Sequence, residues 1–201
     1  GVFMGFHPDT YTVNYCLSKG LIYVQGYCFD QYLIDYMSMR GGWQAPYYAS
    51  LGHVLVPSSE QDCSNRMIIF PHNTWDWRAS FEEGHCYNTH LWDVMYYTPF
   101  SNFPDALAYM LDLIYKTEEN LNPFGYVCVQ HEFDFMLQYN LTSELKNYYG
   151  RIIDLGYTMQ MFNETAECFK RTYKKNPIYE IDFNSPLNGK RVEWYLSLIH
   201  I

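Results

Sequence analysis

One histidine and two carboxylates follow directly on an apolar run within residues 125–135. The run at 126–129 is followed by His131, Glu132 and Asp134. A short run of β-branched and aromatic residues bounded by Gly predicts a buried parallel strand, and α/β folds place active sites just past such strands. A histidine there could transfer protons near neutral pH. A structural histidine bonded to the backbone is the alternative, and the segment alone favours neither.

Three further expected strands, at 21–25, 43–48 and 67–70, also run into polar and aromatic residues. The carboxyl ends of parallel strands converge on one mouth when a sheet closes into a barrel. His131 and Asp76 would then share a cavity with aromatic side chains. Such a cavity is typical of sugar binding, because aromatic faces suit flat sugar rings, and it could perform acid/base chemistry.

Strand-like and helix-like patterns alternate along the chain, which predicts an α/β fold with a parallel sheet. Repeated βα units of this length favour a barrel, and an open sheet is the alternative. Residues 72–103 are aromatic and irregular, and their length indicates a functional excursion. The tail at 178–195 alternates and contains the turn signal Asn188-Gly189, which predicts a β-hairpin. Helices are expected at 9–19, 31–39, from 104 to at least 114, at 145–156 and at 164–174, with another strand at 157–162.

The composition argues against several partner classes. A net charge of -9 and a pI near 5.1, without a Lys/Arg cluster, argue against nucleic acid or an anionic membrane as a partner. No apolar stretch reaches about 18 residues, so no transmembrane segment is expected. The cysteines form no CxxC pair, which excludes the common structural zinc motif. Two glycosylation sequons occur, Asn140-Leu141-Thr142 and Asn163-Glu164-Thr165.

The two ends of the chain do not read as natural termini. Residue 1 is Gly and opens directly into an apolar run. Residues 196–201 match the translation of an adaptor used to build sequencing libraries, so we interpret them as an artefact. We expect the natural protein to continue in both directions. The predicted organisation is one domain over 1–175, followed by a β segment over 176–195 that could begin a second β domain.

Four segments carry motifs whose order is informative. Residues 26–31 read Gly-Tyr-Cys-Phe-Asp-Gln, and residues 43–47 read Trp-Gln-Ala-Pro-Tyr. Trp75-Asp76-Trp77 follows, and residues 127–131 read Val-Cys-Val-Gln-His. This order resembles the polysaccharide deacetylase family, the chitooligosaccharide deacetylase-like enzymes, in which an HSxxH motif, an Arg-x-Pro-Tyr strand, an Asp-Trp segment and a final strand ending in His follow one another. The resemblance implies an incomplete, distorted (β/α) barrel that lacks its N-terminal strand or strands.

The family resemblance also implies roles for individual residues. His131 would be the general acid, and Asp76 the carboxylate that orients it. A zinc, nickel or cobalt ion would be the cofactor, an acetylated glycan the partner, and the setting extracytoplasmic or at the cell surface. Five residues would contact the substrate: Trp43, Tyr47, Trp77, Tyr27 and Gln44.

The chain departs from the family pattern at the metal site. Tyr27 and Gln31 stand where the family has two metal-binding histidines, and Gln44 stands where it has the Arg that holds the base. The motif that carries the base and the metal-binding Asp would lie upstream of Gly1. Four other histidines are candidate replacement ligands, although a loop of solvated polar residues is the simpler interpretation for those in 72–103: His7, His72, His85 and His90.

Three functions therefore follow from the sequence as hypotheses. The first is metal-assisted deacetylation of an N- or O-acetylated glycan by a carbohydrate-active hydrolase. The second is a deacetylase-like domain that has lost its activity and binds glycan through aromatic residues. The third is a glycoside hydrolase that pairs Asp76 with Glu132 or Asp134.

Overall fold

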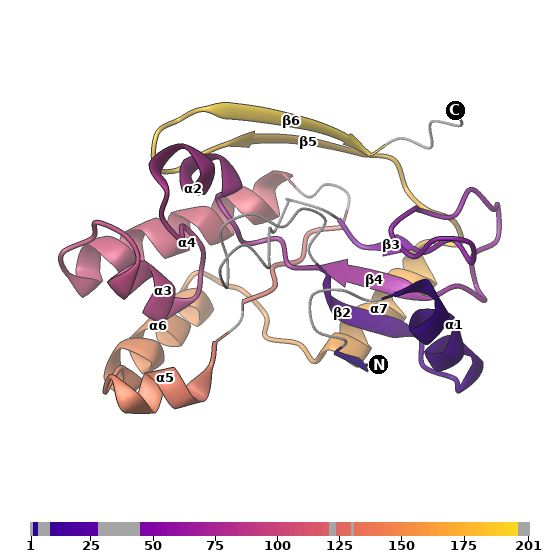
Figure 1. Ribbon diagram of the computed structural model, residues 1–201, viewed down its shortest axis with the longest axis horizontal. Helices are drawn as coiled ribbons and strands as arrows, with labels where there is room; N and C mark the ends of the chain where they lie inside the picture. The colour runs from indigo at the N-terminus through magenta and orange to yellow at the C-terminus, as the bar shows by residue number, and fades with distance from the viewer. Residues whose placement is uncertain (1, 4–8, 28–44, 121–123, 130, 197–201) are drawn as a thin grey trace.

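A small mixed sheet lies beside a group of helices, and a β-hairpin covers one side of the molecule (Figure 1). The computed structural model describes residues 2–3, 9–27, 45–120, 124–129 and 131–196. The expected mixture of helices and strands in an α/β arrangement is confirmed. The elements are β1 Val2–Phe3, α1 Thr10–Ser18, β2 Tyr23–Tyr27, β3 Tyr47–Tyr48, β4 Ile68–Pro71, α2 Trp77–Glu83, α3 Leu91–Tyr96, α4 Phe103–Asn120, α5 Phe133–Gln138, α6 Thr142–Asp154, α7 Phe162–Thr172, β5 Tyr179–Asn184 and β6 Arg191–Leu196.

The sheet has the strand order β1-β2-β4-β3. β1 and β4 both pair with β2 in parallel, whereas β3 pairs with β4 antiparallel. The strand expected at 43–48 is therefore short and runs against the direction that a barrel of βα units requires. Within the described residues β1 and β3 form two open edges, so the structure does not confirm a closed (β/α) barrel of the deacetylase type.

Both faces of the sheet are buried. Successive side chains along β4 enter different cores on its two faces. Ile68 and Phe70 pack into the larger core, among the helices. Met67 and Ile69 point the other way, into a smaller core that Val13 of α1 completes. This burial explains why the strand reads as a continuous apolar run rather than as an alternating one.

The helix boundaries follow capping signals that are visible in the sequence. Asp9 caps α1, its side chain accepting a hydrogen bond from the backbone N–H of Thr12 at 2.9 Å. Gly20 and Gly156 follow the ends of α1 and α6 with φ of 83° and 88°, the left-handed conformation that glycine adopts without strain. Within the described residues no helix is both long and apolar enough to cross a membrane.

Residues 125–129 belong to no helix or strand, which corrects the expected strand at 126–129. Side chains take the place of a neighbouring strand. The Asn73 amide donates to Tyr126 O at 2.8 Å and accepts from the Cys128 N–H at 3.0 Å. The Thr74 hydroxyl donates to Cys128 O at 2.7 Å. The apolar pattern correctly predicted burial, but it could not show that the backbone groups bond to side chains.

Two other regions also differ from the prediction. Residues 157–161 form no strand, and α7 begins at Phe162. The expected irregular excursion at 72–103 contains the short helices α2 and α3. Both helices were missed because neither reaches eight residues, which leaves too few turns for a clear apolar stripe.

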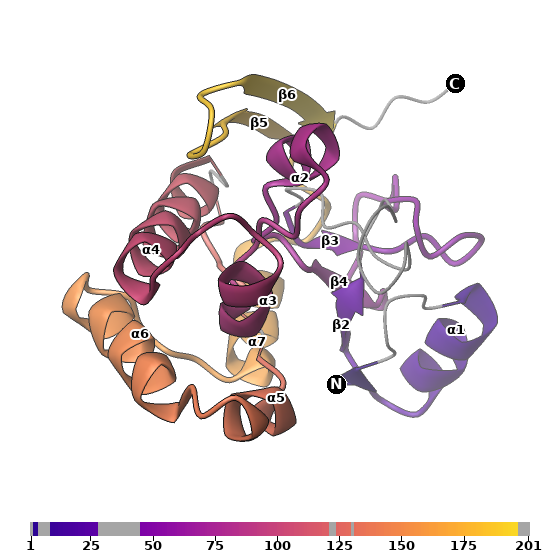
Figure 2. The ribbon, with the colours of Figure 1, turned by 60° about the vertical axis from the view of Figure 1, so that its left-hand side comes forward.

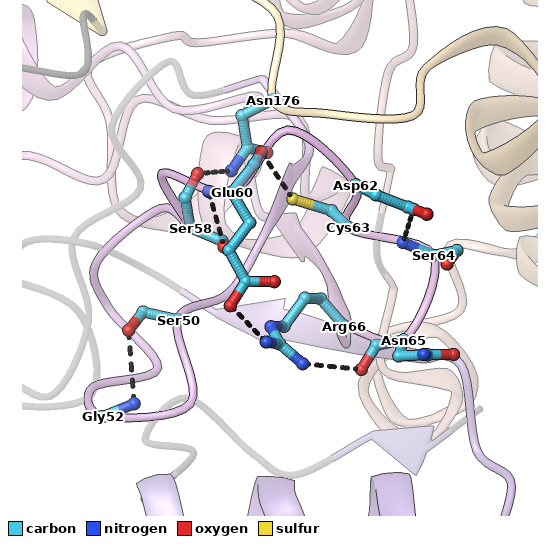
Figure 3. A network of polar contacts seen from close by, with 10 residues as sticks. All are labelled: Ser50, Gly52, Ser58, Glu60, Asp62, Cys63, Ser64, Asn65, Arg66 and Asn176. Atoms are coloured by element: carbon cyan, nitrogen blue, oxygen red, sulfur yellow. Dashed lines mark hydrogen bonds and ion pairs between the residues drawn. The ribbon is translucent and has the colours of Figure 1, made fainter.

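Asn176 ties the loop after β3 to the chain that follows α7. Its side-chain amide donates to Tyr48 O at 2.9 Å and to Ser58 O at 2.8 Å, and accepts from the Tyr48 N–H at 2.6 Å. Figure 3 shows Asn176 against this loop, together with the Arg66–Glu60 ion pair and the contact between Cys63 and Glu60 O.

The predicted C-terminal β-hairpin is present. β5 and β6 pair antiparallel, and Gly189 in the turn has a φ of 68°. The hairpin lies over α4 and α2 (Figures 1 and 2). Phe183 of β5 is fully buried in the larger core, so the hairpin shares the core of the preceding residues.

Candidate functional site

His90 and His131 form a stacked pair in which each ring binds the backbone of the other segment. The ring centroids are 5.5 Å apart and the planes are inclined by 29°. The Leu91 N–H donates to His131 Nδ1 at 3.4 Å, and the Glu132 N–H donates to His90 Nε2 at 3.0 Å. The two hydrogen bonds join the start of α3 to the start of α5.

These contacts determine the tautomer of each imidazole. His131 Nδ1 and His90 Nε2 accept hydrogen bonds, so a neutral ring carries its proton on the opposite nitrogen. His90 Nδ1 accordingly faces a carboxylate oxygen of Asp93 at 3.3 Å. The Asn88 amide donates to the other Asp93 oxygen at 2.7 Å and accepts from the His90 N–H at 2.7 Å. His90 is thus held by a chain of polar groups at the start of α3.

His72 lies close enough to this pair to respond to its charge. It follows β4 and is buried. Burial, with a smaller contribution from the charge of His90, lowers the pKa of His72 to about 4. The same two causes, in the same order, lower the pKa of His131 to about 3. We call His72, His90 and His131 the histidine cluster.

The lowered pKa of His131 conflicts with the expected role of a general acid. A general acid must hold a proton to transfer at the working pH, and this imidazole is neutral at pH 7. Tyr148 and Tyr149 meet the ring edge-on, each with centroids at 5.4 Å, and no carboxylate contacts it among the described residues. The surroundings favour a neutral ring.

Asp76 has a structural setting instead of the expected place beside His131. Its side chain caps α2 by accepting from the Ala79 N–H at 3.1 Å, and it accepts from the Ser185 hydroxyl at 2.5 Å. Burial raises the pKa of Asp76 to about 6, against the effect of these hydrogen bonds. The side chain is fully buried, whereas Glu132 and Asp134 are exposed on the surface. The carboxylate pair that a glycoside hydrolase needs is not supported by this arrangement.

The expected substrate-contacting residues fall into two groups. Tyr47 is buried in the smaller core, where its hydroxyl donates to Val54 O at 3.1 Å, so it does not line a surface groove. Trp43 and Gln44 lie outside the described residues, and of Tyr27 and Trp77 only the backbone is described. His7, a candidate metal ligand, also lies outside the described residues.

The described residues do not fit a divalent metal ion. No group of three or more His, Cys, Asp or Glu side chains within them is arranged to hold one. His90 and His131 each use one nitrogen to accept a backbone N–H, and the second nitrogen of His90 faces Asp93. His85, a further candidate ligand, packs edge-on against Tyr87 at 6.0 Å. Backbone hydrogen bonds to one nitrogen of each ring hold His90 and His131 in place without a metal.

Aromatic side chains from α3 and α5 gather around Trp92 beside the histidine pair. Phe135 stacks on Trp92 with centroids 4.5 Å apart and planes inclined by 10°. Tyr97 meets Trp92 at 4.8 Å, and Tyr96 meets Tyr139 at 4.9 Å. The tyrosines reach the surface: Tyr96 is 50%, Tyr97 49% and Tyr139 38% exposed. We call Trp92, Tyr96, Tyr97, Phe135 and Tyr139 the ring cluster.

The sequence did not predict the ring cluster. α3 and α5 are each six residues long, and they are separated by 36 positions along the chain. The aromatic richness of 72–103 was visible, but nothing in the sequence showed that residues after His131 would join it. Figure 2 shows α3 below α2, with α5 beneath α3.

Comparison with known proteins identifies no relative. No family model, no curated protein and no solved structure matches this chain.

Proposed function

We propose that this chain is a carbohydrate-binding domain whose binding surface is the ring cluster. The observation that carries the proposal is the set of three tyrosines, each partly exposed, that pack around Trp92. A tyrosine in this position offers an apolar face to the C–H groups of a sugar and a hydroxyl to its polar edge. The stacked neighbours restrain the rings, so binding costs little side-chain entropy.

The charge around the ring cluster favours a neutral or amine-bearing glycan. Asp93 lies in the first turn of α3 and Asp134 in the first turn of α5, with Glu132 exposed just before it. The whole chain carries a net charge of -9. A polyanion such as nucleic acid would be repelled here, whereas a neutral sugar would not, and the carboxylates could bind an amino group.

Tyr96→Ala tests the proposal. We expect it to weaken binding of N-acetylglucosamine and glucosamine oligomers about fivefold, because loss of one stacking ring is worth about 1 kcal/mol. Isothermal titration calorimetry measures the affinity. Tyr115→Ala is the matched control, since Tyr115 is a helical tyrosine with 53% exposure that lies outside the ring cluster. Equal affinity of the two variants, or no binding by the unmodified chain, would contradict the proposal.

The second candidate is the hydrolysis of an acetylated glycan, by a domain related to the polysaccharide deacetylase barrel. One observation favours it: three histidines from distant parts of the chain lie together, and two of them, His90 and His131, lie at the starts of the helices that carry the ring cluster. Neutral imidazoles can hold a bound water or a polar substrate group by hydrogen bonds. The described residues do not fit a metal, so no metal-dependent step is derived for them.

Release of acetate from acetylated oligosaccharides tests this second candidate. If hydrolysis occurs at the histidine cluster, His131→Ala should reduce the rate about tenfold or more, because the neutral imidazole would no longer hold the water or the substrate group by a hydrogen bond worth about 1.4 kcal/mol. His53→Ala is the control, because His53 is an exposed histidine in a separate loop. Binding without any acetate release would leave the carbohydrate-binding proposal and eliminate this one.

A further inference from the structure

Tyr96 and Tyr139 bring two phenol rings together from separate parts of the chain. Their ring centroids are 4.9 Å apart, and the ring planes are inclined by 49°. Tyr96 is the last residue of α3, and Tyr139 is the C-terminal cap of α5. Both side chains are partly exposed, so a reagent in solution can reach either ring.

The contacts around the two tyrosines keep their rings near one another. Trp92 packs against both, with centroids at 5.8 Å from Tyr96 and 5.4 Å from Tyr139. At the opposite ends of the same two helices, hydrogen bonds of the His90 and His131 rings join the backbones. α3 and α5 are therefore bound to each other at their starts and meet at their ends through the tyrosine pair.

Other tyrosine pairs in the described structure lack the exposure of this one. Tyr87 contacts Tyr109 with centroids at 5.6 Å, and Tyr148 contacts Tyr149 at 5.7 Å. Tyr87, Tyr109 and Tyr148 are buried. In neither of these pairs can a reagent in solution reach both rings, which sets them apart from the pair at the ends of α3 and α5.

We propose that Tyr96 and Tyr139 are a site of oxidative cross-linking, in which a carbon–carbon bond joins the two rings. The oxidant is hydrogen peroxide, used by a haem peroxidase. Each phenol loses one electron and one proton and becomes a phenoxyl radical, whose unpaired electron is shared with the ring carbons beside the hydroxyl. Two such radicals held side by side combine without a diffusional encounter.

The atoms and electrons of this reaction balance. The new bond joins one carbon beside the hydroxyl in each ring, and the hydrogen on each of these carbons then moves as a proton to the phenol oxygen. The pair loses two electrons and two protons in total, and these convert one hydrogen peroxide into two waters. The proposal does not depend on the proposed carbohydrate-binding function.

The test treats the folded chain with hydrogen peroxide and a haem peroxidase, followed by a thiol reductant and trypsin. The reductant is needed because a disulfide between Cys86 and Cys128 would join the same two tryptic peptides with the same loss of mass. Those peptides are 79–116 and 117–146, and each carries one tyrosine of the pair. We expect mass spectrometry to find them joined, with the sum of their masses less two hydrogens, and fragmentation to place the bond between Tyr96 and Tyr139.

Two variants and a dilution make the result specific. Tyr96→Phe retains the packed ring but cannot form a phenoxyl radical, so it should abolish the joined peptides. Tyr97→Phe is the matched control, because Tyr97 has a similar exposure and also contacts Trp92, at 4.8 Å, and it should leave the yield unchanged. About tenfold dilution of the chain should not change the fraction joined, because both rings belong to one molecule.

Three outcomes would overturn the proposal. The first is the absence of joined peptides from the unmodified chain after oxidation. The second is a joined product that persists in Tyr96→Phe, and the third is a fraction joined that falls on dilution, which would show that the bond forms between molecules.

Discussion

At the scale of single residues, the neutral histidines are the most informative feature. His72 and His131 have pKa values lowered by burial, to about 4 and about 3, against an ordinary value of 6.5. In the unfolded chain both would bind a proton near pH 6.5, while in the folded chain they stay neutral. The unfolded state therefore binds more protons between about pH 6.5 and 4, and the free energy of unfolding falls as the pH decreases through that window.

This linkage gives a prediction for His131→Asn. Asn can still accept the Leu91 N–H but does not titrate, so the variant should lose less stability on acidification than the unmodified chain. The difference between the two should reach roughly 2 kcal/mol between pH 7 and pH 5. Urea unfolding at several pH values measures it. His53→Asn is the control, because His53 Nδ1 accepts a similar bond from the Leu55 N–H at 3.3 Å in an exposed loop. If the free energy of unfolding changes with pH equally in the unmodified chain and in His131→Asn, the pKa of His131 is not lowered in the folded state.

Asp76 acts in the opposite direction and must be considered in the same experiment. Its pKa is raised by burial to about 6, so the folded state binds more protons than the unfolded state between about pH 4 and 6. The contribution of Asp76 to stability is present at low pH and is lost as the pH rises through 6. The effect of Asp76 on the free energy of unfolding is the same in the unmodified chain and in both variants. It therefore cancels when their pH dependences are compared, and the remaining difference is due to His131.

At the scale of elements, the segment 125–129 shows how a strand can be replaced. Asn73 and Thr74, just after the end of β4, form hydrogen bonds with its backbone groups, at positions where a neighbouring strand would otherwise do so.

Helix positions were predicted well from caps and glycines, as at Asp9, Gly20 and Gly156. Such signals are local. The role of Asn73 depends on contacts across more than 50 positions, and no pattern in the sequence reveals it.

Asn73→Ala should consequently destabilise the fold strongly. It leaves a buried carbonyl and a buried N–H without their partner, which costs about 2–4 kcal/mol together. Asn14→Ala is a suitable control, because the Asn14 amide makes an exposed bond to Leu51 O at 2.9 Å and should cost below about 1 kcal/mol. Denaturant unfolding gives both values. Hydrogen exchange at the Cys128 amide provides a local check, and an unchanged rate in Asn73→Ala would count against the interpretation.

At the scale of the whole molecule, the hairpin and the helices share one core. Phe183 from β5 is buried with residues from the sheet and from α4, α6 and α7. The Ser185 hydroxyl after β5 also bonds to Asp76 at the start of α2. The sequence predicted the hairpin from alternation and a turn signal, but suggested that it could begin a separate domain. The burial of Phe183 in this core could not be deduced from the sequence. The apolar pattern of β5 would be the same if the hairpin packed on a core of its own.

Phe183→Ala tests this shared core. Truncation of a buried Phe costs about 3–5 kcal/mol, and we expect the entire chain to lose that stability in a single transition. Ile178→Ala, at a neighbouring position that is 73% exposed, should change it little. Circular dichroism follows the unfolding of the helices as denaturant is added. Helices that melt at an unchanged denaturant concentration in Phe183→Ala would show that the hairpin is independent.

The Asn176 contacts with Tyr48 and Ser58 have a chemical consequence for the ageing of the protein. A buried amide that makes three hydrogen bonds would be a weak point if it could convert slowly to a carboxylate. That conversion usually starts when the next backbone nitrogen attacks the side-chain carbonyl carbon. Residue 177 is Pro, whose nitrogen carries no hydrogen and cannot close that ring. The link between the loop after β3 and the chain after α7 is thereby protected against spontaneous deamidation.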